Sequence, residues 1–64
     1  MIEYIEIIFF PDNTTQITIK KDNETIVKKC CHAGKTMVWM AKTGNNWTWI
    51  KDLDTGNDIA IFEK

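Results

Sequence analysis

The residues of this 64-residue chain that are best suited to chemistry stand together as Cys30, Cys31 and His32. Thiolates and imidazoles are ligands that zinc prefers. If this segment is helical, neighbouring side chains point about 100° apart, so three in a row cannot converge on one ion. The chain has no second group of cysteine or histidine residues that could complete a site. We therefore expect no metal site and interpret the cysteines as structural thiols.

Catalytic machinery has few candidate residues. The chain contains no serine, and its single histidine directly follows the two cysteines, so a cysteine–histidine pair would need unusual geometry. Asp52, Asp54 and Asp58 flank a predicted turn, where aspartate is favoured for its hydrogen bonds to the backbone. As a calcium loop, this segment lacks the bidentate glutamate that completes an EF-hand. We predict no catalytic residue, no cofactor and no enzymatic activity.

Lysines and aromatic rings are the residue types that bind single-stranded nucleic acid, through charge and through base stacking. Residues 20–42 hold six lysines against two carboxylates, a net charge of +4. Lys28, Lys29 and Lys35 would contact the phosphates. The whole chain, however, has a net charge of −1 and no arginine, a balance that is unusual for a nucleic-acid-binding protein. Nucleic-acid binding is therefore the alternative hypothesis, behind binding to a protein.

The elements that must position these residues begin with a hairpin. Residues 2–10 are rich in isoleucine and aromatic residues, which is typical of a strand. Residues 11–14, Pro-Asp-Asn-Thr, predict a turn. Residues 16–20 alternate polar and apolar side chains, which predicts a second strand with Ile17 and Ile19 facing the core.

Residues 24–33 can be interpreted in two ways. Their apolar residues occur in pairs, which suits the i,i+4 spacing of a helix better than the alternation of a strand. Asp22 or Asn23 could cap the N-terminus of such a helix, and Gly34 suits the position after its C-terminus. We predict a short helix here, and a strand is the alternative.

Residues 36–63 predict a three-stranded meander, with strands at 36–42, 46–51 and 58–63 and turns at the two glycines between them. The whole chain then forms one domain of the α+β class: a five-stranded antiparallel sheet made of a hairpin, a short helix and a meander, with the helix on one face. The alternative is a small all-β barrel.

The two faces of the predicted meander are both apolar. A three-residue turn at residues 54–56 places Trp49 opposite Ile61 and Ile50 opposite Ala60. One face would carry Met37, Trp39, Ala41, Thr48, Ile50, Ala60 and Phe62. The other would carry Val38, Met40, Trp47, Trp49, Lys51, Ile59 and Ile61. One short helix can cover only one of them, and exposed apolar patches usually mark an interface.

We therefore expect Trp39 to face the core and the opposite face to bind a protein partner. The predicted partner-binding residues are Met40, Trp47, Trp49, Lys51 and Ile61. The partner is either a different protein or a second copy that forms a homodimer by stacking sheet on sheet. A self-assembling structural protein with no separate partner is a further alternative.

Composition suggests a setting for such a module. Adjacent cysteines rarely form a disulfide, so a reducing compartment such as the cytoplasm is the simpler expectation, and no segment is apolar enough to predict a membrane span. Abundant isoleucine, lysine and asparagine without arginine suggests an AT-rich coding source. This bias in a small protein is typical of phage and mobile-element accessory proteins, so we expect an inhibitor or modulator of a host protein.

Overall fold

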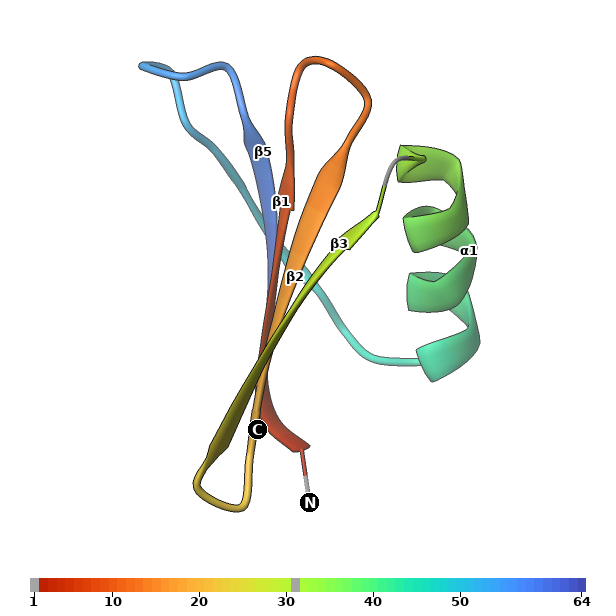
Figure 1. Ribbon diagram of the computed structural model, residues 1–64, viewed down its shortest axis with the longest axis vertical. Coiled ribbons are helices and arrows are strands. Elements are labelled where there is room, and N and C mark those ends of the chain that lie inside the picture. The colour runs from red at the N-terminus through yellow and green to blue at the C-terminus, as the bar shows by residue number, and fades with distance from the viewer. Residues whose placement is uncertain (1, 31) are drawn as a thin grey trace.

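The computed structural model describes residues 2–30 and 32–64, which form one open sheet and one helix (Figure 1). The elements follow in the order β1 (Ile2–Phe9), β2 (Thr15–Lys21), β3 (Glu24–Cys30), α1 (Ala33–Thr43), β4 (Thr48–Lys51) and β5 (Asp58–Glu63). The strand order in the sheet is β3-β2-β1-β5-β4, and every neighbouring pair is antiparallel. The predicted α+β class is thus confirmed, and the barrel alternative is wrong because the sheet has two free edges.

The hairpin of β1 and β2 forms as its sequence predicts. Phe10 N–H donates to the carbonyl oxygen of Thr14 at 2.9 Å, and this bond closes the turn. The carboxylate of Asp12 accepts hydrogen bonds from the backbone N–H and the hydroxyl of Thr14. Asn13 takes a positive φ of 73°, which asparagine tolerates better than most residues.

The helix predicted at residues 24–33 is wrong for residues 24–30, because this segment is strand β3. Asp22 and Asn23 both have positive φ, 46° and 68°, and form a two-residue turn between β2 and β3 rather than a helix cap. Such turns match the twist of paired strands. β3 is a largely exposed edge strand, so it does not need clean apolar alternation. Cys31 lies outside the described residues.

The segment predicted as a strand at 36–42 belongs to α1. Its threonine, valine and tryptophan residues favour strands by propensity, but its buried positions have helical spacing. Thr36 and Met40 are buried one turn apart, and Trp39 packs beside them. Packing of these side chains against the sheet stabilises the helix more than the strand propensity of the individual residues opposes it. Tertiary packing therefore decides the structure of this segment.

Glycine residues have different roles in α1 from those predicted. Gly44 follows the helix in the left-handed conformation, with φ 68°, and its N–H donates to the carbonyl oxygen of Ala41. This is a helix C-terminal cap, not the hairpin turn that was expected. Gly34, expected just beyond a helix end, lies inside the first turn of α1.

The turn between β4 and β5 holds one residue more than predicted. Asp52 N–H donates to the carbonyl oxygen of Asn57 at 2.9 Å, so these two residues close a loop of residues 53–56. The carboxylate of Asp52 also accepts hydrogen bonds from the backbone N–H groups of Asp54 and Thr55, at 3.0 and 3.4 Å. An aspartate side chain that bonds to the following backbone in this way favours such a loop.

This extra residue shifts the register of β4 by one. Trp49 lies opposite Ala60 and Ile50 opposite Ile59, instead of opposite Ile61 and Ala60 as expected. A shift of one residue turns every side chain of a strand to the other face. Trp49 therefore shares the face of the buried Ala60, toward α1, and Ile50 points to the side that no helix covers.

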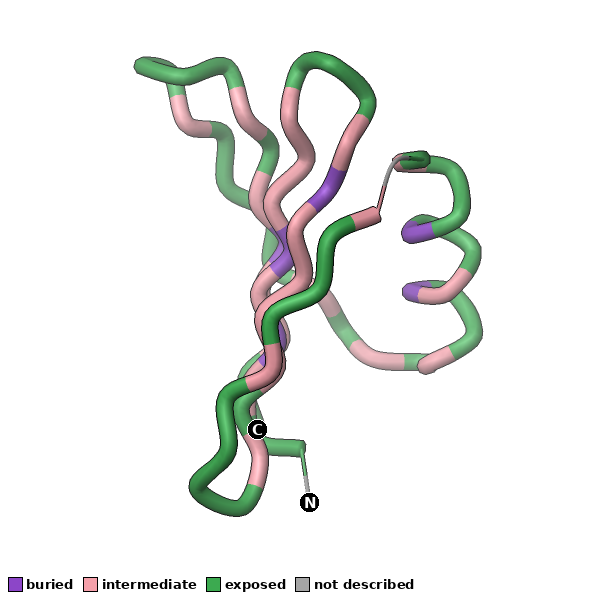
Figure 2. The backbone as a smooth tube through the Cα atoms, viewed as in Figure 1, coloured by how far each residue is buried: buried purple, intermediate pink, exposed green. Residues whose placement is uncertain are grey.

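The core lies between α1 and the middle of the sheet. Its buried apolar residues are Ile5, Ile7, Met40 and Ala60. Half-buried side chains surround them: Phe9, Ile17, Ile19, Trp39, Trp47 and Phe62. In Figure 2 the buried positions of α1 are on its inner side and its outer side is exposed. The predicted inward positions of Ile17, Ile19 and Trp39 are confirmed.

Candidate interaction surface

The side of the sheet away from α1 carries a cluster of isoleucines. Ile8 lies opposite Ile59, which lies opposite Ile50, so these three form a row across β1, β5 and β4. Ile61 is two residues along β5 from Ile59 and has the same orientation. We call these four residues the isoleucine surface. Ile50 is exposed and the other three are half-buried, with no described element over them.

The edge strand β4 extends this apolar area around the rim of the sheet. Trp49, on the helix side, is 50% exposed and packs on the ring of Phe9 with 5.4 Å between ring centroids. Ile50, its neighbour on the other face, is 47% exposed. Leu53, in the loop after β4, is 88% exposed. Three large apolar side chains within five residues are thus accessible at one edge of the molecule.

The β2–β3 half of the same face is mostly polar, and the exposed Val27, opposite Thr18, is its apolar exception. Gln16, Thr18 and Lys20 alternate along β2, and Lys29 lies opposite Gln16. The ammonium group of Lys20 lies 5.3 Å from the ring centroid of Tyr4, which is within the range of a cation–π contact. The uncovered face is therefore divided between an apolar half and a polar half.

Tyr4 lies on the uncovered side of β1 and is hydrogen-bonded to Glu6, the next residue on that side of the strand. Its hydroxyl donates to the carboxylate of Glu6 at 3.1 Å. Burial raises the pKa of Tyr4, and the hydrogen bond to Glu6 and the negative charges of Glu6 and Glu63 raise it further. Tyr4 thus remains a neutral hydrogen-bond donor at neutral pH.

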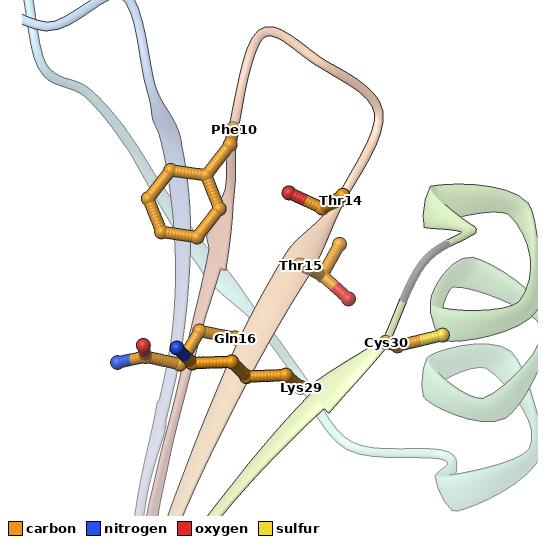
Figure 3. A pocket seen from close by; sticks show the side chains of 6 residues that line it. All are labelled: Phe10, Thr14, Thr15, Gln16, Lys29 and Cys30. Atoms are coloured by element: carbon orange, nitrogen blue, oxygen red, sulfur yellow. The ribbon is translucent and has the colours of Figure 1, made fainter.

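A pocket of about 370 Å³ lies near the first turn, where β1 and β3 end and β2 begins. Phe10, Gln16 and Lys29 line it together with Thr14, Thr15 and Cys30 (Figure 3). Figure 3 shows that Cys30 points toward α1, whereas Gln16 and Lys29 point to the other side of the sheet. The pocket has an aromatic ring and an ammonium group, but no pair of groups suited to acid–base or nucleophilic chemistry.

Two of the predicted partner-binding residues belong to the core. Met40 is buried on the inner side of α1, against the sheet. Trp47 is half-buried, with its ring 6.4 Å from that of Trp39 and 6.1 Å from that of Phe62. Its indole Nε1 is buried without a hydrogen-bond partner among the described residues. The expectation that Trp47 lies on the face opposite Trp39 is therefore wrong.

The other predicted partner-binding residues are distributed over both sides of β4 and β5. Trp49 and Lys51 share the helix side, and Ile61 lies on the uncovered side. Lys51 forms an exposed ion pair with Asp58 at 3.2 Å and donates to the carbonyl oxygen of Gly56 at 3.3 Å. One shared exposed face for all five predicted residues is thus wrong. Trp49 and Ile61 remain near one edge, joined through Ile50 and Ile59.

The predicted nucleic-acid contacts do not form one surface either. Lys28 lies on the helix side of β3, Lys29 on the opposite side and Lys35 on α1. Trp49, the most exposed aromatic side chain that the structure describes, is on β4 at the other edge. Four strand spacings of about 4.8 Å separate β3 from β4, about 19 Å in all. The arrangement lacks the basic groove lined by stacking rings that single-strand binders use.

The thiol of Cys30 lies beside the hydroxyl groups of Thr15 and Thr36, whose hydrogen bond of 2.7 Å joins β2 to α1. Its Sγ donates to the carbonyl oxygen of His32 at 3.4 Å. A backbone hydrogen bond at His32 lowers the pKa of Cys30, and the hydroxyls of Thr36 and Thr15 and the charge of Lys35 lower it further. Among residues 2–30 and 32–64, no three histidine, cysteine or acidic side chains are grouped so that they could hold a metal ion.

Comparison of the chain with protein-family models, with curated proteins and with solved structures finds no match. No helix of the described residues is long and apolar enough to cross a membrane. The interaction surface therefore has to be interpreted from its own residues.

Proposed function

We propose that this protein is a small protein-interaction module that binds a protein partner through the isoleucine surface and the adjoining β4 edge. It would act as an inhibitor or modulator that covers a functional surface of that partner. The observation that carries the proposal is the set of accessible apolar side chains at one edge: the isoleucine surface together with Trp49 and Leu53.

The character of this area favours a protein as the ligand. An apolar centre beside a polar margin is the usual anatomy of a protein interface. Trp49 has the large rigid ring that dominates interface energetics when a partner buries it. The polar margin is supplied by the β2–β3 half of the face, through Gln16, Thr18 and Lys20.

The β4 edge offers a second element of recognition. β4 is the last strand of the sheet, so the outer side of its backbone has no partner strand. An extended segment of a partner could add to this edge and contact Trp49 on one face and Ile50 on the other. Since β4 spans only four residues, backbone pairing alone would be weak, and the side chains would supply most of the affinity.

A second copy of the chain is the alternative partner, because the four side chains of the isoleucine surface are apolar and can face a copy of themselves. The carboxylate of Glu6, opposite Ile61, lies beside them and is hydrogen-bonded to Tyr4. Two such sheets would stack at about 10 Å, as in β-sandwiches. A stable dimer needs about 800 Å² of buried surface on each protomer. Light scattering over a range of concentrations distinguishes this case, since a homodimer doubles the mass of the 7.5 kDa chain.

The proposal is tested by affinity capture from the source cell with three forms of the chain. The wild type is compared with Ile50→Glu, on the isoleucine surface, and with Val27→Glu, a similarly exposed residue at the opposite edge of the same face. We expect a partner that binds the wild type and the Val27 variant and is lost from the Ile50 variant. Equal loss from both variants, or from neither, would contradict a binding surface at this edge.

A further inference from the structure

The outer side of α1 is also apolar. Met37 is 47% exposed and Val38 is 56% exposed. Gly34 and Ala41 are exposed on the same side, at the i, i+3, i+4, i+7 spacing of one helix face. We call these four residues the outer helix surface. The inner side of the same helix is already packed on the sheet through Thr36 and Met40, so α1 has two apolar faces, of which the fold uses one.

The residue types of the outer helix surface are not explained by the stability of the fold. A Cβ atom added at Gly34 would meet nothing within 4 Å, so the backbone does not require glycine there. Glycine is the least favourable residue in a helix after proline, and valine is less favourable than most. A solvent-facing side would be better served by alanine, lysine or glutamate. Local rules broken in this way are expected at functional positions.

Lysines border this surface on one flank. Lys35 and Lys42 are seven residues apart, so they lie above one another on the same side of α1. Lys28 lies on the helix side of the neighbouring strand β3. None of the three makes an ion pair with any residue that the structure describes. Residues 25–51 contain five lysines and no aspartate or glutamate, so no acidic side chain of this segment balances them.

We propose that the outer helix surface binds an amphipathic helix of a partner protein whose polar flank is acidic. Gly34 and Ala41 allow the two backbones to approach closely, and Met37 and Val38 supply the apolar contacts between them. Glutamates on the incoming helix would pair with the lysine flank. Two helices that pack side by side meet through apolar residues at i, i+3, i+4 and i+7, the spacing that the outer helix surface has.

Charge disfavours a second copy of this chain at this surface. Two α1 helices packed antiparallel would place their lysine flanks near each other, and in either orientation the partner helix offers no acidic residue to pair with the lysines. Like charges across an interface oppose association. The surface also lies on the opposite side of the molecule from the isoleucine surface, as Figure 1 shows for α1 and the sheet. The inference therefore stands independently of the proposed function, and both together would make the chain a bridge between two partners.

The test uses the ¹⁵N-labelled full chain and a synthetic helical peptide of about five turns. The peptide carries leucine and alanine at i, i+3, i+4 and i+7 and glutamate elsewhere, and a matched peptide carries lysine in place of glutamate. We expect the acidic peptide to shift the amide resonances of residues 34–42 and the basic peptide to shift none. The absence of shifts at about 1 mM acidic peptide, the weak limit of useful affinity, would overturn the proposal.

Charge reversal supplies the decisive control. In the variant Lys35→Glu with Lys42→Glu, we expect affinity for the acidic peptide to fall at least about tenfold, and the basic peptide to bind instead. Lys29→Glu, on the other side of the sheet, should leave the acidic peptide unaffected. If the two peptides bind equally to the wild type, or if reversal changes neither affinity, the lysine flank has no role and the proposal is wrong.

Two further measurements test whether Gly34 serves binding or only affects helix stability, and whether the ligand is a protein helix or a lipid membrane. Gly34→Ala should raise the melting temperature by about 4 °C and yet weaken peptide binding, because the added methyl group blocks close approach. A gain in both would contradict the packing argument. Vesicles of anionic lipid are titrated in parallel. If vesicles shift the amide resonances of residues 34–42 and the acidic peptide shifts none, the surface binds a membrane and not a protein, and the proposal is wrong.

Discussion

The hydroxyl groups of Thr15 and Thr36 offer the sharpest test of how α1 sits on the sheet. Both residues are buried, at 1% and 3% exposure, and their Oγ1 atoms lie 2.7 Å apart. One hydroxyl satisfies the other, and the bond joins β2 to the helix across 21 residues of sequence. We therefore predict that replacing either threonine by valine, which has nearly the same shape, destabilises the chain more than replacing both.

The magnitude follows from which polar group loses its partner. Each single valine variant leaves one buried hydroxyl with only the Cys30 sulfur, a weak hydrogen-bond partner, beside it, and we expect this loss to cost about 1–3 kcal/mol. Replacing both removes the unsatisfied group, so the double variant should lie within about 1 kcal/mol of the wild type. The double-mutant cycle then gives an interaction free energy of about 1–3 kcal/mol between the two positions. A domain of this size has a total stability of roughly 3–10 kcal/mol, so the effect is large enough to measure.

Urea unfolding, followed by tryptophan fluorescence, measures the four stabilities. The slope of unfolding free energy against urea should stay the same in all forms, since the buried surface hardly changes. Additive effects, with an interaction free energy near zero, would show that Thr15 and Thr36 do not touch. The helix would then not occupy the position described here, and residues 33–43 would need another arrangement.

Three further predictions test separate parts of the structure. Trp47→Phe should change the unfolding free energy by less than about 1 kcal/mol, because loss of an unpaired buried N–H offsets the loss of ring area. A loss of about 3 kcal/mol, as large as that of truncating a packed tryptophan to alanine, would contradict this. Gly44→Ala should cost about 1 kcal/mol in thermal unfolding, because φ there is 68°, and an unchanged melting temperature would rule out the left-handed cap. Hydrogen bonds from Thr14 lower the pKa of Asp12, so its contribution is present above the pKa of an unfolded aspartate and is lost as pH falls through the lowered folded value. Asp12→Ala should therefore destabilise the chain at about pH 7 and match the wild type near pH 2, and a deficit independent of pH would refute the assignment.

The fold class could be predicted from the sequence because its signals are local. The alternating residues of β2, the turn at Pro11 and the isoleucines of β1 each specify their own structure. The total of five strands and one helix is correct only because two errors cancel: a helix was predicted where β3 lies, and a strand where α1 lies. The inward orientation of Ile17 and Ile19 follows from the same alternation, whereas Trp39 faces inward from a helix and not from the predicted strand.

The exchange of helix and strand between residues 24–33 and 36–42 could not be predicted in this way. β3 is an edge strand, so both its faces can carry lysine, and the clean alternation that identifies a strand is absent. α1 carries apolar residues on its outer side as well as its inner side, so it lacks the polar face that identifies a helix. The local sequence signal for the β2–β3 hairpin is the Asp22-Asn23 dipeptide, whose residues both adopt positive φ in the turn. This signal is weaker than Asp-Gly or Asn-Gly, because glycine adopts positive φ more readily than asparagine.

The β4 part of the candidate site was misplaced by a single residue in one turn, and Met40 was misplaced because its segment is a helix. Counting a three-residue loop instead of residues 53–56 turned Trp49 to the wrong face and separated Ile50 from Ile59. The signal that could have corrected it is Asp52, whose side chain bonds to the loop backbone. The burial of Trp47 depends on contacts with Trp39 and Phe62, which no local pattern reveals.

The most direct measurement of the central proposal uses the isoleucine δ1-methyl groups, because isoleucines occur on both sides of the sheet. The chain is labelled at these methyl groups and the captured partner is saturated in a cross-saturation NMR experiment. We predict the strongest transfer at Ile50, Ile59, Ile61 and Ile8, and little at Ile5 and Ile7 in the core. Transfer strongest at Ile17, Ile19 and Ile26, on the helix side, would contradict a partner on the isoleucine surface.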